Sequence, residues 1–299
     1  MNNLSHQNII PCRKSSKACF TNPISGRAGL QSPVVVMVVT PIYGAPALAI
    51  DIGRERVLVV ADLHLGIEAE LASGGVGLPS QMPRVKERLI ELIQQQEPDR
   101  LLFLGDVKHN VPVAAWQEWR ELPEFFADLA KLVHVEIVPG NHDGDIEGMV
   151  PSNVDVHNSK GLVLGRRERV GLIHGHTWPR PEVLKVAMLI AAHNHPAAEF
   201  RDELGARTIE PIWLRCKLEP KKFPDKLRGA IRDNGPELLV MPAFSELISG
   251  AAVNRAIPGE LLGPMFKAGA VRLDDAEAYL LDGTFLGTVA ALRELWVRH

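Results

Sequence analysis

The sequence predicts a protein that combines α-helices with β-sheets, and two patterns support this fold class. Between residues 57 and 138, short apolar segments alternate with amphipathic segments at helical spacing, in the order strand, loop, helix, strand, helix, strand. After residue 150, short segments separated by turns indicate a second set of largely antiparallel strands. We therefore expect an α+β fold.

Composition limits the class of protein. An apolar fraction of 46% and a charged fraction of 23% are ordinary for a globular chain of 299 residues. The net charge of −3 argues against a protein that coats nucleic acid non-specifically, although it is compatible with a local basic groove. No run reaches the ~18 apolar residues that a membrane helix needs. The three cysteines lack CxxC spacing, so we expect neither a disulfide framework nor a thiolate zinc site. We therefore expect the protein to be cytoplasmic.

The first part of the chain differs from the rest. Residues 1–32 are rich in Asn, Ser, Gly and basic side chains and lack an apolar period or a secretory signal pattern. We expect residues 1–36 to be a disordered leader or a misassigned start, with Met37 as the natural first residue. Residues 37–299 should form a single domain, with a motif core at 55–200 and C-terminal strands and a helix at 205–299.

Three strands and two helices are expected in the first half. One helix begins after Ser80 as its N-cap and ends before Pro98, and the other covers Trp116–Leu132. Each strand runs into polar residues. Val57–Ala61 precedes Asp62-Leu63-His64, Leu101–Leu104 precedes Gly105-Asp106-Val107-Lys108-His109, and Val135–Val138 precedes Pro139-Gly140-Asn141-His142-Asp143.

The second half offers further strands and two more polar strand ends. The expected strands are Val154–His157, Leu162–Leu164, Val170–His174, Met188–Ala192, Ile209–Leu218 and Leu238–Phe244, followed by a hairpin of Ala278–Leu281 and Phe285–Val289. Two of these segments lead into histidines, in His174-Gly175-His176 and His193-Asn194-His195.

Histidine and carboxylate residues thus gather at five strand ends. An isolated Asp106 could equally cap a helix, and a lone histidine is a structural or surface group roughly ten times as often as a ligand. His6, His134, His157 and His299 keep that interpretation. The grouped residues are different, because three oxygen ligands and four imidazoles suit a pair of divalent ions such as Mn²⁺, Fe²⁺ or Zn²⁺. Two ions about 3.5–4 Å apart can share a central carboxylate and clamp a phosphate.

The five motifs resemble, in order and spacing, those of the calcineurin-like metallophosphoesterases. More narrowly, the chain resembles the archaeal phosphoesterases related to SbcD and the ligase-associated DNA damage response endonuclease group. The resemblance implies a four-layer αββα sandwich, with two facing mixed β-sheets flanked by helices. The closer match rests on Ala61-Asp62-Leu63-His64-Leu65-Gly66, Leu78-Pro79-Ser80-Gln81, Leu104–His109, Trp213-Leu214-Arg215 and Met241-Pro242-Ala243-Phe244.

The resemblance also implies roles for individual residues. His142 would stand near the leaving oxygen as general acid or stabilise charge on the phosphoryl group, and His109 would position the substrate phosphate, as in the nuclease branch. We expect two divalent ions, preferably Mn²⁺, with Fe²⁺ or Zn²⁺ as alternatives. One ion would be held by Asp62, His64, Asp106 and His195, and the other by Asp106, Asn141, His174 and His193, with Asp106 as the bridge.

Four positions carry narrower expectations. Ala192 stands where the family usually has glycine, and it should fit if its φ is negative. His176 is expected at the surface or behind the ligands. Asp143 should orient a histidine or cap a turn. Lys108 either touches the substrate phosphate or is solvated.

The function that follows is a metal-dependent phosphodiesterase, with a nuclease acting on DNA in DNA repair as the first candidate. Alternatives are a phosphodiesterase or phosphatase acting on a small nucleotide or another phosphoester, and a non-catalytic binding scaffold. The basic stretch at residues 212–232 could guide a phosphate backbone if it folds beside the metals. Otherwise it is a solvated charge run on a surface loop.

Overall fold

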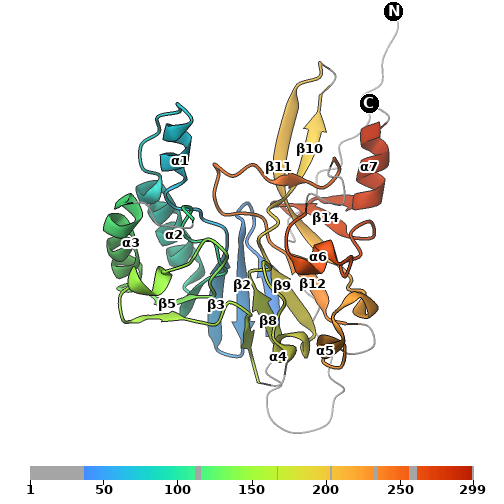
Figure 1. Cartoon of the computed structure of the whole chain (residues 1–299), viewed down its shortest axis with the longest axis horizontal. Coiled ribbons are helices and arrows are strands. Elements are labelled where there is room, and N and C mark those ends of the chain that lie inside the picture. The colour runs from blue at the N-terminus through green and yellow to red at the C-terminus, as the bar shows by residue number, and fades with distance from the viewer. Residues whose placement is uncertain are drawn as a thin grey trace, which may run out of the picture.

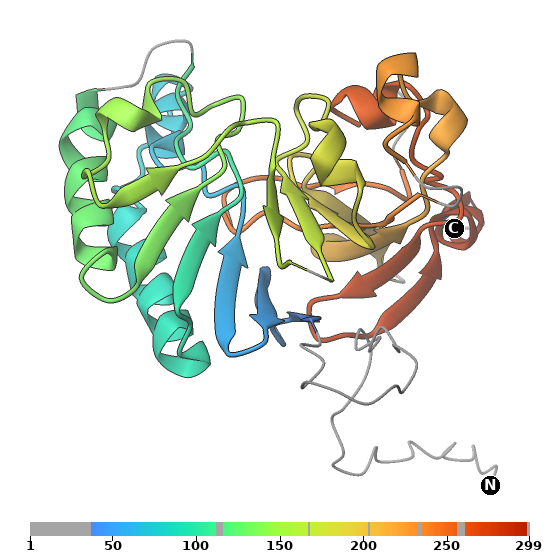
Figure 2. The same cartoon turned by 90° about the horizontal axis from the view of Figure 1, so that it is seen from below.

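The computed structural model describes residues 37–111, 116–166, 168–202, 204–231, 235–255 and 261–297. The expected leader at residues 1–36 therefore lies outside the described residues. The described chain forms two β-sheets packed face to face, with helices on both outer sides (Figure 1, Figure 2). This is the predicted four-layer αββα sandwich.

The first sheet has six strands that lie side by side in sequence order. Its first three strands form an antiparallel meander, and the following ones pair in parallel. The strands are β1 (Met37–Pro41), β2 (Ala47–Ile52), β3 (Glu55–Val60), β4 (Arg100–Phe103), β5 (His134–Ile137) and β6 (Val154–Val156). The helical segments of this half are α1 (Ile67–Ser73), α2 (Met82–Gln96), α3 (Trp116–Leu129) and the 3₁₀ turn η1 (Ile146–Gly148).

The second sheet has the strand order β13-β10-β11-β12-β9-β8-β7, and β14 pairs with both β11 and β15. Its strands are β7 (Leu162–Leu164), β8 (Val170–Ile173), β9 (Met188–Ala191), β10 (Pro196–Arg201), β11 (Arg207–Cys216), β12 (Glu237–Val240), β13 (Ala251–Ala252), β14 (Glu277–Leu280) and β15 (Phe285–Thr288). The helical segments are α4 (Pro181–Leu184), η2 (Pro220–Lys222), α5 (Asp225–Arg228), α6 (Pro264–Lys267) and α7 (Val289–Val297). In the part of the chain that is described, no helix has both the length and the apolar character needed to cross a membrane.

The apolar run of β4 is buried on both faces, as its sequence indicates. Leu101 and Phe103 face the layer of α2 and α3, whereas Leu102 faces the second sheet. Trp213 of β11 is 1% exposed and fills the space between the sheets. A third apolar layer packs the outer helices onto the second sheet, with Met265 of α6 among its members. The core therefore holds the ends of β3, β4, β8 and β9 at one fixed edge.

The expectation of largely antiparallel strands after residue 150 misses the parallel pairs, which are β5 with β6, β8 with β9, β9 with β12 and β10 with β13. β6 joins the first sheet in parallel with β5, and β8 pairs in parallel with β9 through the crossover that contains α4. Short apolar runs do not indicate strand direction, which explains the error. The parallel pairing matters for the site because parallel neighbours end at the same edge of a sheet. A smaller difference is that α2 begins one residue later than expected, with Gln81 rather than Ser80 at the cap position.

Candidate metal centre

The polar strand ends converge at one edge of the sandwich, where the carboxyl ends of five strands meet. β3, β4 and β5 supply them from the first sheet, and β8 and β9 from the second. The residues involved are Asp62 and His64 after β3, Asp106 after β4, Asn141 after β5, His174 after β8, and His193 and His195 after β9.

One group of side chains consists of Asp62, His64, Asp106 and His195. Each offers one donor atom, and these four atoms lie within 4.8 Å of one another. His195 Nε2 is 3.3 Å from Asp62 Oδ1, and His64 Nε2 is 3.7 Å from Asp106 Oδ2. The structure thus brings together the four residues expected around the first metal.

A second group shares Asp106 with the first. Donor atoms of Asp106, His174 and His193 lie within 4.8 Å of one another. His174 Nε2 is the centre of this group, because it lies 3.3 Å from Asp106 Oδ2, 3.1 Å from His193 Nδ1 and 3.3 Å from Asn141 Oδ1. These are the residues expected around the second metal, and Asp106 lies between the two groups.

The donor atoms themselves indicate that a cation fits here. Asp62 Oδ1, His64 Nε2 and His195 Nε2 are buried and have no hydrogen-bond partner among the described residues. His174 Nδ1 lies 3.1 Å from the Leu104 carbonyl and donates to it, so Nε2 is the ring nitrogen directed at Asp106. Buried acceptors without donors are costly, by roughly 1–3 kcal/mol each. Imidazole and carboxylate donors suit Mn²⁺, Fe²⁺ or Zn²⁺.

Two glycines allow these side chains to approach so closely. A Cβ atom at Gly105 would lie 2.3 Å from His174 Nδ1, and one at Gly140 would lie 2.2 Å from Asp106 Oδ1. Both distances are far shorter than van der Waals contact. The glycines of the second and third motifs are therefore required by packing around Asp106 and His174.

Backbone strain is concentrated in the same residues. Asp62, His64, Asp106, His193 and His195 all have positive φ, between 43° and 71°. Such a conformation costs on the order of 1–3 kcal/mol for a residue with a side chain. At Asp62 and His64 it is held by backbone hydrogen bonds between the loops after β3 and β4, from Asp62 N to Gly105 O and from His64 N to Asp106 O. Ala192 is absent from the positive-φ residues, so the condition for its fit is met.

Burial and charge set the protonation of the centre. Burial lowers the pKa of His174, but the Asp106 and Asp62 carboxylates outweigh burial and raise that pKa to about 9. Burial would raise the pKa of Asp106, yet His174 holds it well below its usual range. Burial lowers the pKa of His64 to about 3 and that of His193 to about 4. At neutral pH, His64 and His193 are therefore neutral and Asp106 is ionised, as ligands must be.

Asp143 caps the turns around the centre, which agrees with one of its two expected roles. Its Oδ1 accepts hydrogen bonds from the amides of Val107 and Lys108, and its Oδ2 accepts one from Gly140 N. Lys108 meets neither of its expectations. It is 1% exposed, and its Nζ donates to the Asn110 carbonyl at 2.7 Å. Lys108 therefore supports the loop after β4 and does not face substrate or solvent.

His142 lies at the open side of the centre. Its Nε2 is 4.0 Å from Asp106 Oδ2, its Nδ1 donates to the His109 carbonyl, and its backbone N–H donates to Asp106 Oδ1. Because Nδ1 is occupied by a carbonyl acceptor, Nε2 is the atom that can exchange a proton with a ligand.

Both ring nitrogens of His109 have partners. Nδ1 lies 3.1 Å from His64 Nδ1, and Nε2 lies 2.6 Å from Glu70 Oε2. When His109 carries its proton on Nε2 and donates it to Glu70, its Nδ1 accepts the hydrogen bond from His64 Nδ1. The Nε2 atom of His64 then has a free lone pair directed at the first group of donor atoms. In this arrangement His109 orients His64, and neither nitrogen is available to a phosphate.

Two glutamates of the centre have no sequence signal. Glu70 lies on α1, and Glu118 lies on α3, where it is buried and accepts hydrogen bonds from the amides of His109 and Asn110. Their importance depends on where two helices pack, which the motif pattern does not indicate. His176 is half-buried, 5.3 Å from the His174 ring, and burial lowers its pKa to about 4.

The basic stretch lies away from these residues. β11 is antiparallel to β12, and β12 is parallel to β9, so the chain leaves β11 at the edge opposite the one where His193 follows β9. Figure 1 shows α5, within this stretch, at the lower end of the sheets. The basic stretch could guide a phosphate backbone only if it folded beside the metals. Its described residues do not lie there, so this expectation is not met.

Comparison with known proteins gives a family. A family model described as calcineurin-like phosphoesterase matches residues 55–222 of the chain. The fold is similar to the nuclease MPE of Pseudomonas putida, with 21% identity, 82% of this chain and 97% of that chain covered, and a TM-score of 0.46. It is also similar to YfcE, a phosphoesterase from E. coli, with 16% identity, 78% and 98% covered, and a TM-score of 0.35. Likeness at these levels does not indicate a shared substrate.

Proposed function

Because the chain belongs to the calcineurin-like phosphoesterase family and is a hydrolase of phosphoester bonds, we propose that it is a two-metal phosphodiesterase that cleaves a nucleic-acid backbone, with DNA as its substrate. Mn²⁺ as the native metal, a role in DNA repair and a cytoplasmic location are parts of the same proposal. They are supported by the donor set, by the motif resemblance and by the cysteine pattern respectively.

The observation that carries the proposal is the position of Asp106 in both groups of donor atoms. The candidate ligands of one metal are Asp62, His64, Asp106 and His195, and those of the other are Asp106, Asn141, His174 and His193. Divalent ions bound there would clamp a phosphate group and provide Lewis-acid activation.

His142 would act on the leaving group. Its Nδ1 is fixed by the His109 carbonyl, so the ring presents Nε2 towards the space in front of Asp106. As an imidazolium it would donate the Nε2 proton to the departing oxygen, or a hydrogen bond to the phosphoryl group. His142 is therefore the candidate general acid.

His109 receives a different role from the one that the resemblance implies. Since its two nitrogens contact His64 and Glu70, we assign it as a positioning residue that sets the tautomer of His64. A direct contact with the substrate phosphate would first require the contact with Glu70 to open.

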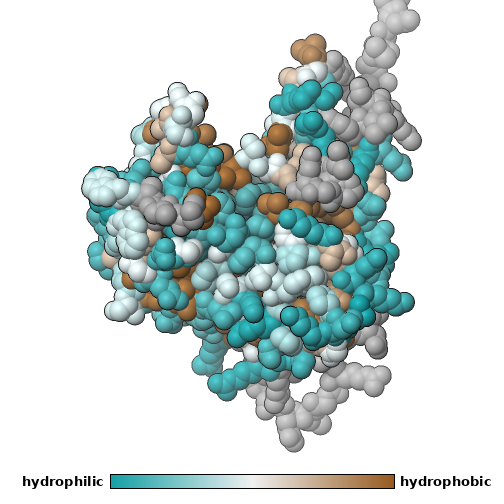
Figure 3. Space-filling view, in the orientation of Figure 1, coloured by the Kyte–Doolittle hydropathy of each residue, from teal (hydrophilic) through white to brown (hydrophobic). Residues whose placement is uncertain are grey.

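The nucleic-acid part of the proposal rests on the motif resemblance and on the shape of the surface. Figure 3 shows a hollow between the projection around α1 and that of β10 and β11, with mostly hydrophilic residues on its floor. An open hollow suits an extended polyanion better than a closed pocket would. The small-phosphoester alternative keeps the same centre, because one site can serve many substrates.

An assay with Mn²⁺-loaded protein tests the proposal. The substrates are single- and double-stranded DNA, bis-p-nitrophenyl phosphate and p-nitrophenyl phosphate. We expect cleavage of DNA and of the diester, and slower turnover of the monoester. A protein that hydrolyses the small esters but leaves both forms of DNA intact favours the small-substrate alternative. A metal-loaded protein without any hydrolysis favours the scaffold.

A further inference from the structure

The hairpin of β10 and β11 begins at the metal centre and projects from the body of the molecule (Figure 1). β10 starts at Pro196, directly after His195. Side chains alternate between the two faces of a strand, so the register of the hairpin decides which residues share a face. One face carries the cross-strand pairs of Ala197 with Pro211, Glu199 with Ile209, and Arg201 with Arg207.

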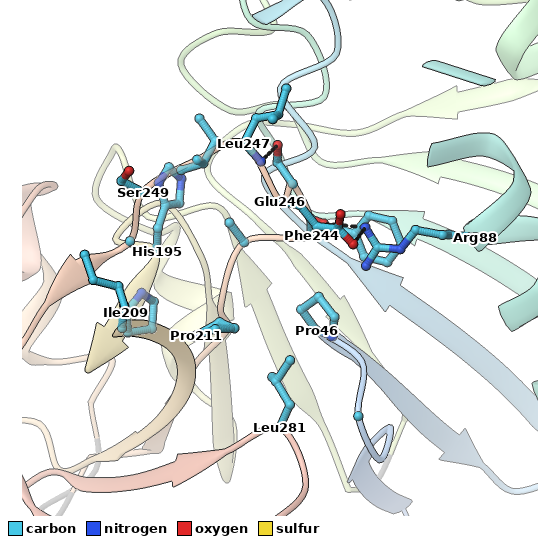
Figure 4. Close-up of a pocket in the computed structure, with 17 residues that line it drawn as sticks. Pro46, Arg88, His195, Ile209, Pro211, Phe244, Glu246, Leu247, Ser249 and Leu281 are labelled. Atoms are coloured by element: carbon cyan, nitrogen blue, oxygen red, sulfur yellow. Dashed lines mark hydrogen bonds and ion pairs between the residues drawn. The ribbon is translucent and has the colours of Figure 1, made fainter. Parts of the chain in front are cut away.

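The end of this face nearest the metals is a pocket of about 430 Å³. His195 lies at one side of it, and Ile209 and Pro211 of β11 line it below His195 in the view of Figure 4. Pro46 and Leu281 form the opposite wall. The pocket has apolar walls on these two sides, is also lined by Arg88 and Glu246, and joins a candidate metal ligand to the hairpin.

Arginines gather further along the same face. Glu199 is 2% exposed, and its carboxylate lies 2.9 Å from Arg255 Nη1 and 3.7 Å from the Nε atoms of Arg201 and Arg207. Arg255 follows β13, which pairs with β10. Arg207 and Arg255 by themselves place two guanidinium groups against the single carboxylate of Glu199. The side chains of Arg207 and Arg255 are 56% and 52% exposed, so guanidinium donors remain open to a phosphate.

We propose that this face of the hairpin binds the sugar-phosphate backbone of a nucleic-acid strand whose scissile phosphate lies at the metal centre. The proposal rests on the function proposed above and names how that substrate is held. The pocket receives the sugar and base next to the cleaved bond between its apolar walls, and the arginines bind phosphates farther along. These contacts position the strand and do not read its sequence.

The dimensions agree with such a strand. Glu199 and Arg201 lie four and six residues beyond His195, which is about 14 and 20 Å at ~3.4 Å per residue of strand. A stacked nucleic-acid strand carries one phosphate per ~3.4 Å. The arginines therefore reach phosphates roughly four to six nucleotides from the bond that is cleaved.

The test compares a long with a short substrate in the double variant Arg207→Gln/Arg255→Gln. The substrates are a single-stranded DNA of about 12 nucleotides, which is twice the reach of the arginines, and bis-p-nitrophenyl phosphate, which is too small to reach them. Each lost phosphate contact lowers the slope of log K against log salt by ~0.7 and weakens binding about 5-fold at 0.1 M salt. We expect the ratio of kcat/KM for DNA to that for the small diester to fall about 25-fold.

The control variant is Lys221→Gln/Lys222→Gln, which removes two exposed charges at the opposite edge of the sheet and should leave the ratio unchanged. Equal Mn²⁺ content and equal Tm in all proteins exclude a folding defect. If the arginine double variant does not fold, Arg207→Gln alone should give half the change in slope.

Binding of the fluorescein-labelled DNA, measured by anisotropy without metal, gives a readout that is independent of hydrolysis. A ratio, slope and affinity equal to those of the wild type in the arginine variant overturn the proposal. If the wild-type protein hydrolyses neither substrate but the arginine variant still binds DNA more weakly, the proposed function is contradicted and the inference about the hairpin stands.

Discussion

The ring of His64 is held by His109, since their Nδ1 atoms lie 3.1 Å apart and the other nitrogen of His109 contacts Glu70. His109→Ala should therefore weaken the first metal site, by roughly 10–100-fold in metal affinity, because His64 loses the partner that sets its tautomer. Isothermal titration with Mn²⁺ measures this. His157→Ala, at a histidine outside the groups of possible metal ligands, is the control and should bind metal normally. Normal Mn²⁺ affinity in His109→Ala with a raised KM would show that His109 contacts the substrate phosphate.

Gly140→Ala should reduce activity by about 100-fold or more, because a 1 Å misplacement of a catalytic group has effects of that size. Its Cβ would lie 2.2 Å from Asp106 Oδ1 and 2.4 Å from the Asp106 backbone nitrogen, so the shared carboxylate must move. Gly144→Ala is the matched control in the same loop, since its Cβ meets nothing within 4 Å. Steady-state kinetics and metal content on both variants provide the test. Equal activity in the two would mean that the position of Asp106 is not critical.

Metal affinity should rise with pH between about 6.5 and 9, because the pKa of His174 is raised from 6.5 to about 9. A metal must displace the proton of His174 in that range, whereas His64 and His193, with pKa values lowered to about 3 and 4, are already neutral. The folding stability of the metal-free protein changes with pH in the opposite direction. A raised pKa stabilises the fold fully below pH 6.5, and this stability is lost as the pH rises through about 9.

Titrations at pH 7 in two buffers of different ionisation enthalpy measure the protons released. We expect at least about one proton per metal-loaded chain. Metal binding without proton release, or an affinity that does not change with pH over this range, would contradict the assigned protonation of His174.

His142→Ala should leave both metals bound and slow the chemical step by about 10²–10⁴-fold, which is the usual contribution of a general acid. The loss should be larger for DNA, whose leaving group needs a proton, than for bis-p-nitrophenyl phosphate, whose leaving group does not. Single-turnover rates on the two substrates measure it. The same loss on both would indicate that His142 stabilises the phosphoryl group instead.

The sequence was sufficient to predict the fold class and the group of residues at the strand ends, because both depend on local patterns. Apolar runs that end in Asp62, Asp106 or His174 are visible without a structure, and strand ends of a sheet must converge. That these residues bind metal stays a prediction. The parallel pairing of β8 with β9 could not be foreseen from the apolar runs, since a short apolar strand carries no mark of its direction.

Contacts between distant elements were equally beyond the sequence. Lys108 could be expected in water or against a phosphate, yet burial places its Nζ on the Asn110 carbonyl. Glu70 and Glu118 reach the centre from helices whose packing the motifs do not encode. The arginines around Glu199 come together through the pairing of β10 with β11 and β13, and not through their spacing.

Whether Asp106 joins two metal sites can be decided by anomalous scattering from crystals of the protein grown with Mn²⁺. We expect two Mn²⁺ peaks about 3.5–4 Å apart, on either side of the Asp106 carboxylate, one beside His195 and the other beside His174. Asp106→Asn should lose this pair of peaks and its turnover. A single peak, peaks away from Asp106, or full turnover in Asp106→Asn would contradict a shared carboxylate at the centre of the site.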